Sequence, residues 1–498
     1  MVNSGQLLKF NYKIIEAVTW KLFEIKMKQS LIKLFLESLT NIGRTVHSLD
    51  YAHQWIKEQN EKVKVSVNQI PFKNLNKWHF DKNSLRHDSG KFFSIDGINV
   101  KTNYGSIHSW QQPIINQPEI GYLGVIVKEI NGVLHFLMQA KIEPGNINHV
   151  QLSPTLQATK SNYTKVHKGK SPAYLECFRN AKPKDIIFDQ LQSEQGARFL
   201  KKRNRNIIIK VDGNIEVKDN FIWLTLWQIK ELMKYDNLVN MDTRTVISGI
   251  LFEKPNTKEI IDLAKEIRAN LKENFSKNIF DSIFLNSISY HSENEIIKFV
   301  TRLKTKYELE VKQIPIQSVE NWIITDTSIH HKDQRYFEVI AVDIEIDSRE
   351  VIKWSQPMVK PKQEGICAFI CKKINGIIHF AVQAKLECGN FDIIEFAPTV
   401  QCLTGNYRQS QAGALPFLEY VLNAKQDQII FDTLQSEEGG RFFREQNRNM
   451  IVIGKEDIPI ELPDNHIWMT LNQLYTFLKF NNYLNIQARS LIAAISFV

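Results

Sequence analysis

Short runs of apolar and β-branched residues recur along the chain with the spacing of strands, and dipeptides typical of turns separate them. Residues 122–130 and 133–140 flank Asn131 and Gly132. This dipeptide between strand-like runs is the strongest short-range signal for a β-hairpin. Residues 207–209 are three isoleucines that predict a buried strand, and residues 225–235 have the spacing of an amphipathic helix. The pattern predicts an α+β fold with a largely antiparallel sheet and one or two helices in each module.

A further helix is predicted after residue 193, where a capping residue precedes a charged segment. Ser193 is expected to cap a helix from Glu194 to about Lys202, with Phe199 and Leu200 facing inward. A charged helix is also predicted over residues 258–271.

The polar motifs of the first half recur in the second half. Trp78 matches Trp322 at a separation of 244 positions, and after the loss of one residue Gln192 matches Gln435. Each copy is long enough for its own core. The sequence therefore predicts a tandem duplication. The predicted parts are an N-terminal extension (1–34), a first repeat (35–256), a helical linker (257–283) and a second repeat (284–498).

The first 36 residues alternate lysines with large apolar residues, a pattern of an amphipathic helix. Such a helix can lie on a membrane surface or on a partner. Alternatively it packs on the first repeat, or it is translated upstream sequence with Met27 as the true start. The latter two interpretations are favoured.

The charge and cysteine content narrow the function classes. The formal net charge of +9 favours an anionic partner. The lysines and arginines form no separate basic tail, so nucleic acid is not the expected partner. No apolar run is long enough for a predicted transmembrane helix. The five cysteines form no CxxC pair and do not recur between the repeats, which predicts reduced cysteines in a cytoplasmic protein.

Polar residues kept in both repeats are the first candidates for a functional site. Period-two alternation places His135, Gln139, Lys141 and Glu143 on one face of the hairpin strand. The second repeat keeps all four residue types. A solvated sheet face is the alternative, although such faces usually tolerate changes of polar type.

The segment from Ser153 to Tyr163 shares a Pro-Thr-x-Gln and Asn-Tyr skeleton with residues 397–407. Its hydroxyl and amide groups suit hydrogen bonds to a pyrimidine, a sugar or a pyrophosphate. The alternative is a loop stabilised by its own side chains.

Arginines form the third candidate group. Arg198 and Arg205 recur in the second repeat, and planar guanidinium groups match phosphate oxygens. A helix N-terminus at Ser193 would assist them; pairing with Glu194 or solvent is the alternative. Trp78 and Trp110 are expected either to stack on a base or to lie in the core.

Several common motifs are missing from the sequence. It contains no glycine-rich dinucleotide fingerprint, no phosphate-binding loop with its lysine, no nucleophile elbow and no clustered metal-ligand pattern. An enzyme with this sequence is expected to need no cofactor and no metal.

Three segments together resemble one enzyme family. Residues 85–93, 153–163 and 191–206 are similar to the NDP-hexose 2,3-dehydratases of deoxysugar biosynthesis, and the resemblance runs from about Phe35 to the C-terminus. It implies two Nudix-like α+β modules with mixed or antiparallel sheets and flanking helices, a nucleotide-binding pocket in each, a homodimer, and dTDP-4-keto-6-deoxy-D-glucose as substrate. The glutamate-rich helix of true Nudix hydrolases is absent.

The resemblance also implies the reaction, which is that of a carbon–oxygen hydro-lyase. The C4 ketone acidifies the C3 hydrogen, a base removes it, and an acid helps the C2 hydroxyl to leave. The product, a dTDP-3,4-diketo-2,6-dideoxyhexose, would pass to a separate 3-ketoreductase. Glu143, His135 and Tyr163 are the candidates for the acid and base, and the first repeat is the expected active copy.

The remaining candidates are predicted to bind substrate. Those of the first repeat are Trp78, His87, Trp110, Gln139, Lys141, Ser153, Thr155, Gln157, Ala158, Thr159, Ser161, Asn162, Gln192, Glu194, Arg198, Asn204 and Arg205. Those of the second repeat are Trp322, Trp354, Gln383, Lys385, Thr399, Gln401, Asn406, Tyr407, Gln435, Glu437, Arg441, Asn447 and Arg448. Two other functions stay open: a catalytically inactive nucleotide-sugar-binding protein and a nucleotide-diphosphate hydrolase.

Overall fold

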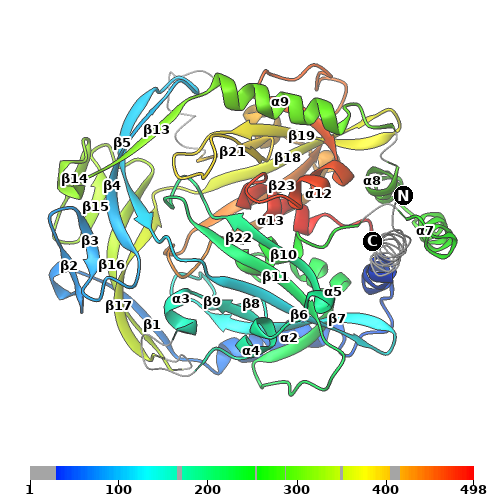
Figure 1. Ribbon diagram of the computed structural model, residues 1–498, viewed down its shortest axis with the longest axis horizontal. Helices are drawn as coiled ribbons and strands as arrows, with labels where there is room; N and C mark the ends of the chain where they lie inside the picture. Colours follow the sequence, from blue (N-terminus) through cyan, green and yellow to red (C-terminus); the bar gives the residue numbers. More distant parts are fainter. Residues whose placement is uncertain (1–29, 165–170, 253–254, 286–287, 348–350, 404–414) are drawn as a thin grey trace, which may run out of the picture.

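A computed structural model describes residues 30–164, 171–252, 255–285, 288–347, 351–403 and 415–498. The fold is α+β, and the strands follow the same order in the two halves of the chain (Figure 1). The strands of the first half are β1 (Val65–Ile70), β2 (Trp78–Phe80), β3 (Ser84–His87), β4 (Ser94–Thr102), β5 (Ser109–Asn116), β6 (Tyr122–Ile130), β7 (Val133–Ile142), β8 (Val150–Ser153), β9 (Leu156–Ala158), β10 (Ile186–Ser193), β11 (Arg203–Lys210) and β12 (Phe221–Thr225). Its labelled helices are α2 (Leu49–Glu61), η1 (Phe72–Asn74), α3 (Lys160–Tyr163), α4 (Leu175–Arg179), η2 (Pro183–Asp185), α5 (Leu226–Leu232) and α6 (Met241–Ile247).

Two helices, α7 (Lys258–Asn270) and α8 (Asn274–Phe284), lead into the second half. Its strands are β13 (Leu309–Ile314), β14 (Trp322–Ile324), β15 (Ser328–His331), β16 (Phe337–Ile346), β17 (Lys353–Pro361), β18 (Gly365–Ile374), β19 (Ile377–Lys385), β20 (Glu395–Ala397), β21 (Val400–Leu403), β22 (Ile429–Ser436), β23 (Gln446–Ile453) and β24 (His466–Thr470). Its labelled helices are α9 (Glu293–Lys306), η4 (Ile316–Ser318), α11 (Leu418–Leu422), η5 (Gln426–Gln428), α12 (Leu471–Leu478) and α13 (Ile486–Ala494).

Each half contains one seven-stranded mixed sheet. The first has the order β10-β11-β6-β7-β12, with β9 beside β6 and β8 beside β7. The second has the order β22-β23-β18-β19-β20, with β21 beside β18 and β24 beside β19. All pairs are antiparallel except β6 with β11 and β18 with β23, which are parallel. The expected antiparallel character is confirmed, with one parallel pair in each sheet.

The two five-stranded sheets exchange a strand between the halves. β1 of the first half pairs with β16 of the second, and β13 of the second half pairs with β4 of the first. Both exchanged strands are antiparallel to their partners. These sheets lie together at the left of Figure 1, and one apolar cluster containing Trp78, Phe93, Phe337 and Val359 joins them. The halves therefore complete each other's sheets.

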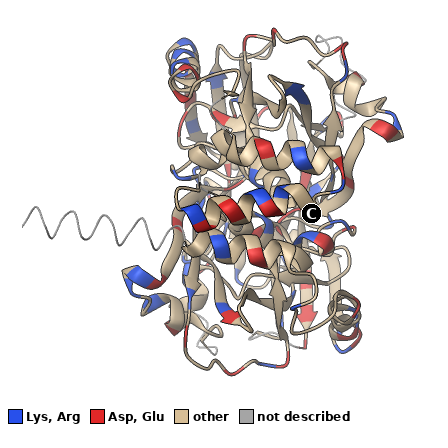
Figure 2. Ribbon diagram, turned by 90° about the vertical axis from the view of Figure 1, so that its right-hand side faces the viewer, with Lys and Arg blue, Asp and Glu red and all other residues tan. Residues whose placement is uncertain are grey.

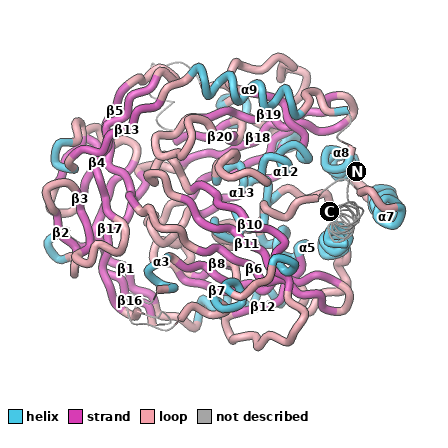
Figure 3. The backbone as a smooth tube through the Cα atoms, in the orientation of Figure 1, coloured by secondary structure: helices cyan, strands magenta, loops and turns pink. Residues whose placement is uncertain are grey.

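The helices α5, α7, α8 and α12 lie at the end opposite the five-stranded sheets (Figure 3). Figure 2 shows basic and acidic residues interspersed on the helices at this end, so the net positive charge is not collected into one patch there. Residues 30–40 form a helix whose Ser38 hydroxyl donates to Leu134 O and accepts from Leu226 N. On α8 the hydroxyl of Ser282 makes the same two contacts, with Ile378 O and Leu471 N. The α8 part of the predicted linker therefore packs on the second half in the way that residues 30–40 pack on the first.

The expected hairpin is confirmed by β6 and β7. Asn131 and Gly132 turn between them with φ of 54° and 77°, the left-handed backbone that this dipeptide tolerates. The expected helices at 225–235 and 258–271 correspond to α5 and α7, and the three isoleucines lie in β11.

The expected helix from Glu194 to Lys202 is wrong, and so is the helix N-terminus predicted for Ser193. Ser193 ends β10, and its hydroxyl donates to Glu395 Oε2 at 2.7 Å. The following residues form a loop whose backbone bonds the other half: Gly389 N donates to Gly196 O, and Lys201 N donates to Gly389 O, both at 2.7 Å. The backbone groups of this segment bond to the second half of the chain and do not form the local hydrogen bonds of a helix.

The mirror-image contact lies between Gly145 and the loop from Gly439 to Arg444. A Cβ at Gly145 would lie 1.7 Å from the carbonyl oxygen of Phe442, and backbone cannot move aside without separating the halves. Gly145→Ala is therefore expected to lower the free energy of unfolding by about 1–3 kcal/mol, measured by urea titration. Gly213→Ala is the control, because nothing lies within 4 Å of its Cβ position. Equal stability of the two variants would contradict the tight contact.

No helix in the described part of the chain is long and apolar enough to cross a membrane. The five cysteines, all within the described residues, are free.

Candidate functional site

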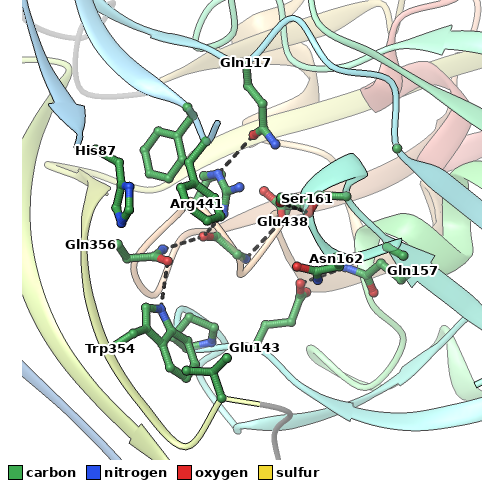
Figure 4. Close-up of a pocket in the computed structure, with 18 of the residues that line it drawn as sticks. His87, Gln117, Glu143, Gln157, Ser161, Asn162, Trp354, Gln356, Glu438 and Arg441 are labelled. Atoms are coloured by element: carbon green, nitrogen blue, oxygen red, sulfur yellow. Dashed lines mark hydrogen bonds between the residues drawn. The ribbon is translucent and has the colours of Figure 1, made fainter. Parts of the chain in front are cut away.

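A cavity of about 310 Å³ lies where the first seven-stranded sheet meets the five-stranded sheets. Residues of both halves line it, and Figure 4 shows the side chains of part of this lining. Its volume is within the range of small-molecule sites, about 300–1,000 Å³.

One wall comes from the five-stranded sheets and carries aromatic rings and cations. Trp78 and Phe93 pack against each other with ring centroids 4.8 Å apart, and Trp354 enters from the second half. Lys77 and Lys353 lie just before and at the start of strands on this wall. Rings beside ammonium groups suit a base and a phosphate.

The opposite wall comes from the first seven-stranded sheet and is rich in carboxyl and amide groups. Glu143 follows β7, and its Oε1 accepts a 2.7 Å hydrogen bond from Gln157 Nε2. Lys141 donates to the backbone oxygen of Gln157 at 2.8 Å. Asn204 donates to Glu194 Oε1 at 2.7 Å. These bonds fix the side chains before any ligand binds.

Two further carboxyl groups line the same cavity. Glu438 belongs to the second half, and its Oε1 accepts from Gly440 N at 3.2 Å. Asp242 belongs to α6 and is only 3% exposed, with an Oδ1 atom that has no hydrogen-bond partner in the described structure. The carboxyl wall is therefore built from both halves of the chain.

Burial and mutual repulsion perturb these groups. Burial, with repulsion from Glu143, raises the pKa of Glu438 to about 8. The same causes hold the pKa of Asp242 well above its usual value, and burial raises that of Glu194. Burial lowers the pKa of Lys202 to about 8. A buried carboxyl group whose pKa is raised in this way can hold a proton at neutral pH, which a general acid requires.

Arg441 of the second half joins the two walls. Its Nε donates to Gln117 Oε1 at 3.1 Å (Figure 4). Its guanidinium lies 4.2 Å from the centroid of the Phe93 ring. Gln356 on β17 donates to the backbone oxygen of Gly440 at 2.8 Å. This bond connects β17 to the loop that contains Glu438 and Gly440.

The cavity gathers many of the predicted residues. They are Trp78, His87, Lys141, Glu143, Gln157, Ala158, Thr159, Ser161, Asn162, Glu194, Asn204, Trp354 and Arg441. Gln139 and Thr155 instead line a neighbouring cavity of about 270 Å³.

Other predicted residues of the first half lie outside the cavity. Arg205 is paired with Asp189 through two hydrogen bonds of 2.6 and 2.7 Å and does not line the cavity. Arg198 stacks 4.2 Å from the Phe337 ring in the second half. The others of this group are Trp110, Ser153 and Gln192.

His135 is fully buried away from the cavity. Its Nδ1 lies 2.9 Å from Val133 O, and its Nε2 accepts from Val46 N. Burial lowers its pKa, so a neutral ring bridging two backbone groups is the expected state. Tyr163 donates to Ile120 O at 3.1 Å, beside the cavity and outside its lining. Of the three acid–base candidates, only Glu143 lines the cavity.

The second half has an equivalent set of residues around Glu387. Gln401 donates to Glu387 Oε1 at 2.9 Å, as Gln157 does to Glu143. The two sets differ in residue type at two positions where the first has a carboxyl group. Gln195 is the counterpart of Glu438, and Gln487 is the counterpart of Asp242.

The described residues predicted from the second repeat that lie outside the cavity are Trp322, Gln383, Lys385, Thr399, Gln401, Gln435, Glu437, Asn447 and Arg448. Asn406 and Tyr407 lie outside the described residues.

Sequence reasoning missed several lining residues. They are Asn76, Lys77, Phe92, Phe93, Gln117, Lys202, Asp242, Lys353, Ser355, Gln356 and Glu438. Asp242, Lys202 and Glu438 had a detectable signal, because each differs in charge from its counterpart in the other half. Among the described residues, no group of three or more His, Cys, Asp or Glu side chains is placed to hold a metal ion.

Comparison with known proteins gives consistent matches. A family model described as NDP-hexose 2,3-dehydratase matches the chain twice, over residues 49–250 and 293–495. A dTDP-4-dehydro-6-deoxy-alpha-D-glucopyranose 2,3-dehydratase of Saccharopolyspora spinosa is 43% identical, with 89% of this chain and 90% of the relative covered. Proteins of the same name from Streptomyces violaceoruber and Amycolatopsis orientalis are 41% and 37% identical. These matches cover 89% and 93% of this chain and 96% and 93% of the relatives.

Proposed function

The chain belongs to the NDP-hexose 2,3-dehydratase family, and we propose that its cavity removes the C2 hydroxyl of dTDP-4-keto-6-deoxy-D-glucose as water. The observation that carries this proposal is one cavity in which a wall of aromatic rings and cations faces a wall of carboxyl groups. A nucleoside diphosphate fits the first wall and the reacting sugar fits the second.

The nucleotide end is assigned by charge and shape. Trp354 is partly exposed and is the ring assigned to stacking on thymine, whereas Trp78 and Phe93 of the same wall are buried. Lys77 and Lys353 lie on the same wall, and ammonium groups balance the charge of the pyrophosphate.

The sugar end supplies the base. The C4 ketone of the substrate acidifies the C3 hydrogen, and the carboxylate of Glu143 takes that proton. Expulsion of the C2 hydroxyl then gives an enol that becomes the 3,4-diketo-2,6-dideoxy sugar. Gln157 orients Glu143 through their 2.7 Å hydrogen bond.

The proposal extends to the wider setting of the enzyme. Each seven-stranded sheet with its helices is taken as a Nudix-like module, and the active protein as a cytoplasmic homodimer. A 3,4-diketone is reactive, so a 3-ketoreductase is the expected next enzyme. We also propose that the reaction requires neither a metal ion nor a nicotinamide cofactor.

The purified protein is expected to convert dTDP-4-keto-6-deoxyglucose, in the presence of a chelator, to a product that has lost one water, detected by mass spectrometry. Release of a nucleoside monophosphate only when metal is added would support the hydrolase instead. Binding without any conversion would support the inactive binding protein, and either result would contradict the dehydratase proposal.

A further inference from the structure

Glu438 is one of several titratable groups of the cavity that the mechanism above does not use; Glu194, Lys202 and Asp242 are others. Glu438 comes from the second half of the chain, on the loop that packs against Gly145 of the first half. Figure 4 shows it in the same cavity as Glu143. A Cβ built on Gly440 would lie 2.3 Å from Glu438 Oε1 and 3.5 Å from Glu143 Oε1. The two carboxyl groups therefore converge on one point of the backbone from opposite halves.

The position is asymmetric between the halves. The residue equivalent to Glu438 in the first half is Gln195, whose Nε2 donates to Glu437 Oε2 at 2.5 Å. A glutamine is thus accommodated at this place in the fold, and packing does not demand a carboxyl group there. Only the cavity that contains Glu143 has an acid at this position.

We propose that Glu438 is the general acid that protonates the C2 hydroxyl as it leaves. The proposal rests on the proposed dehydratase function and assigns the step for which that function named no residue. It makes the active site composite: the base comes from one half and the acid from the other.

The steps balance in atoms and electrons. Glu143 takes the C3 proton, and the electron pair of the C3–H bond is delocalised onto the C4 oxygen. The pair then forms the C2–C3 double bond while the C2–O bond breaks, and the leaving oxygen takes the proton of Glu438 to become water. The enol at C3 loses its hydroxyl proton to Glu438, and C2 gains the proton held by Glu143. Both groups return to their starting states.

The protonation state of Glu438 supports this role. Burial, with the charges of Glu143 and Glu194, raises its pKa to about 8, against the opposing charges of Arg441 and Lys141. At neutral pH the carboxyl group therefore holds the proton that it must donate.

The test compares two leaving groups in Glu438→Gln. On the natural substrate we expect kcat to fall more than about 100-fold, since a general acid typically contributes about 10²–10⁴-fold. On the 2-deoxy-2-fluoro analogue, fluoride leaves without full protonation, so the loss is expected to stay below about tenfold. Fluoride release is followed with an electrode. Exchange of the C3 hydrogen with D2O is expected to persist, because Glu143 is intact.

Several outcomes would overturn the assignment. Unchanged turnover of the natural substrate, equal losses on both substrates, or loss of C3 exchange would each do so. Glu438→Asp keeps the carboxyl group and is expected to retain more natural-substrate turnover than Glu438→Gln; equal losses in the two variants would argue against an acid. If the unaltered protein itself fails to dehydrate the substrate, the proposed function is wrong, whereas an active parent with an equally active Glu438→Gln removes only the role of Glu438.

Discussion

Glu143→Gln is expected to lower kcat about 10³-fold, because it removes the base and leaves the shape of the cavity unchanged. Glutamine keeps the length of the side chain and can still bond Gln157. Binding of the substrate is expected to change little, so the loss should appear in kcat rather than in KM. Exchange of the C3 hydrogen with D2O should be lost together with turnover, which separates this variant from Glu438→Gln.

The matched control is Glu387→Gln, in the equivalent position of the second half. Glu387 accepts a 2.9 Å hydrogen bond from Gln401, so the change has the same local geometry. Turnover is expected to stay within about twofold of the parent, because Glu387 does not line the cavity. If both variants lost activity equally, the preference for the first half would be wrong. If Glu143→Gln kept full activity, the base would have to be another residue.

Local signals predicted the local structure well. The Asn131–Gly132 turn needs only its own backbone conformation, and the hairpin of β6 and β7 follows from it. The segment after Ser193 failed because its bonding partners lie almost two hundred residues away, at Gly389. The exchange of β1 and β13 was equally invisible, since an edge strand has the same pattern whichever half it joins.

The candidate site shows a related limit. Searching for polar residues kept in both repeats found Glu143, Gln157 and Asn204, which hold the same positions in each half. It discarded Glu438 and Asp242, which have glutamine counterparts. A catalytic group that is present in only one of two sites differs between the repeats. A search for residues kept in both repeats therefore finds the residues common to the two sites and excludes a group of this kind. The same search selected Arg205 and His135, whose counterparts Arg448 and His379 make the same contacts within the other half.

Two buried arginines hold the halves together in a reciprocal arrangement. Arg244 on α6 donates to the backbone oxygen of Ser436 at 2.7 Å, and Arg489 on α13 donates to that of Ser193. Each is 1% exposed. Each also bonds a carbonyl oxygen near its own helix N-terminus, Val239 O and Leu484 O respectively. Most of the acceptors of the two arginines are backbone carbonyl oxygens. These oxygens remain buried whatever residue replaces the arginine or its neighbours.

Arg244→Met is therefore expected to cost about 3–5 kcal/mol of unfolding free energy, because it fills the volume but leaves two buried carbonyl oxygens without donors. The measurement is the shift of the urea unfolding midpoint, followed by tryptophan fluorescence. Arg205→Met is the matched control: its guanidinium is partly exposed and pairs with Asp189, so its loss is expected to cost at most about 1 kcal/mol. Since the cavity is lined from both halves, turnover should fall in parallel with the destabilisation of Arg244→Met. Equal midpoints for the two variants would show that the contact between α6, α13 and the opposite sheets contributes little to stability.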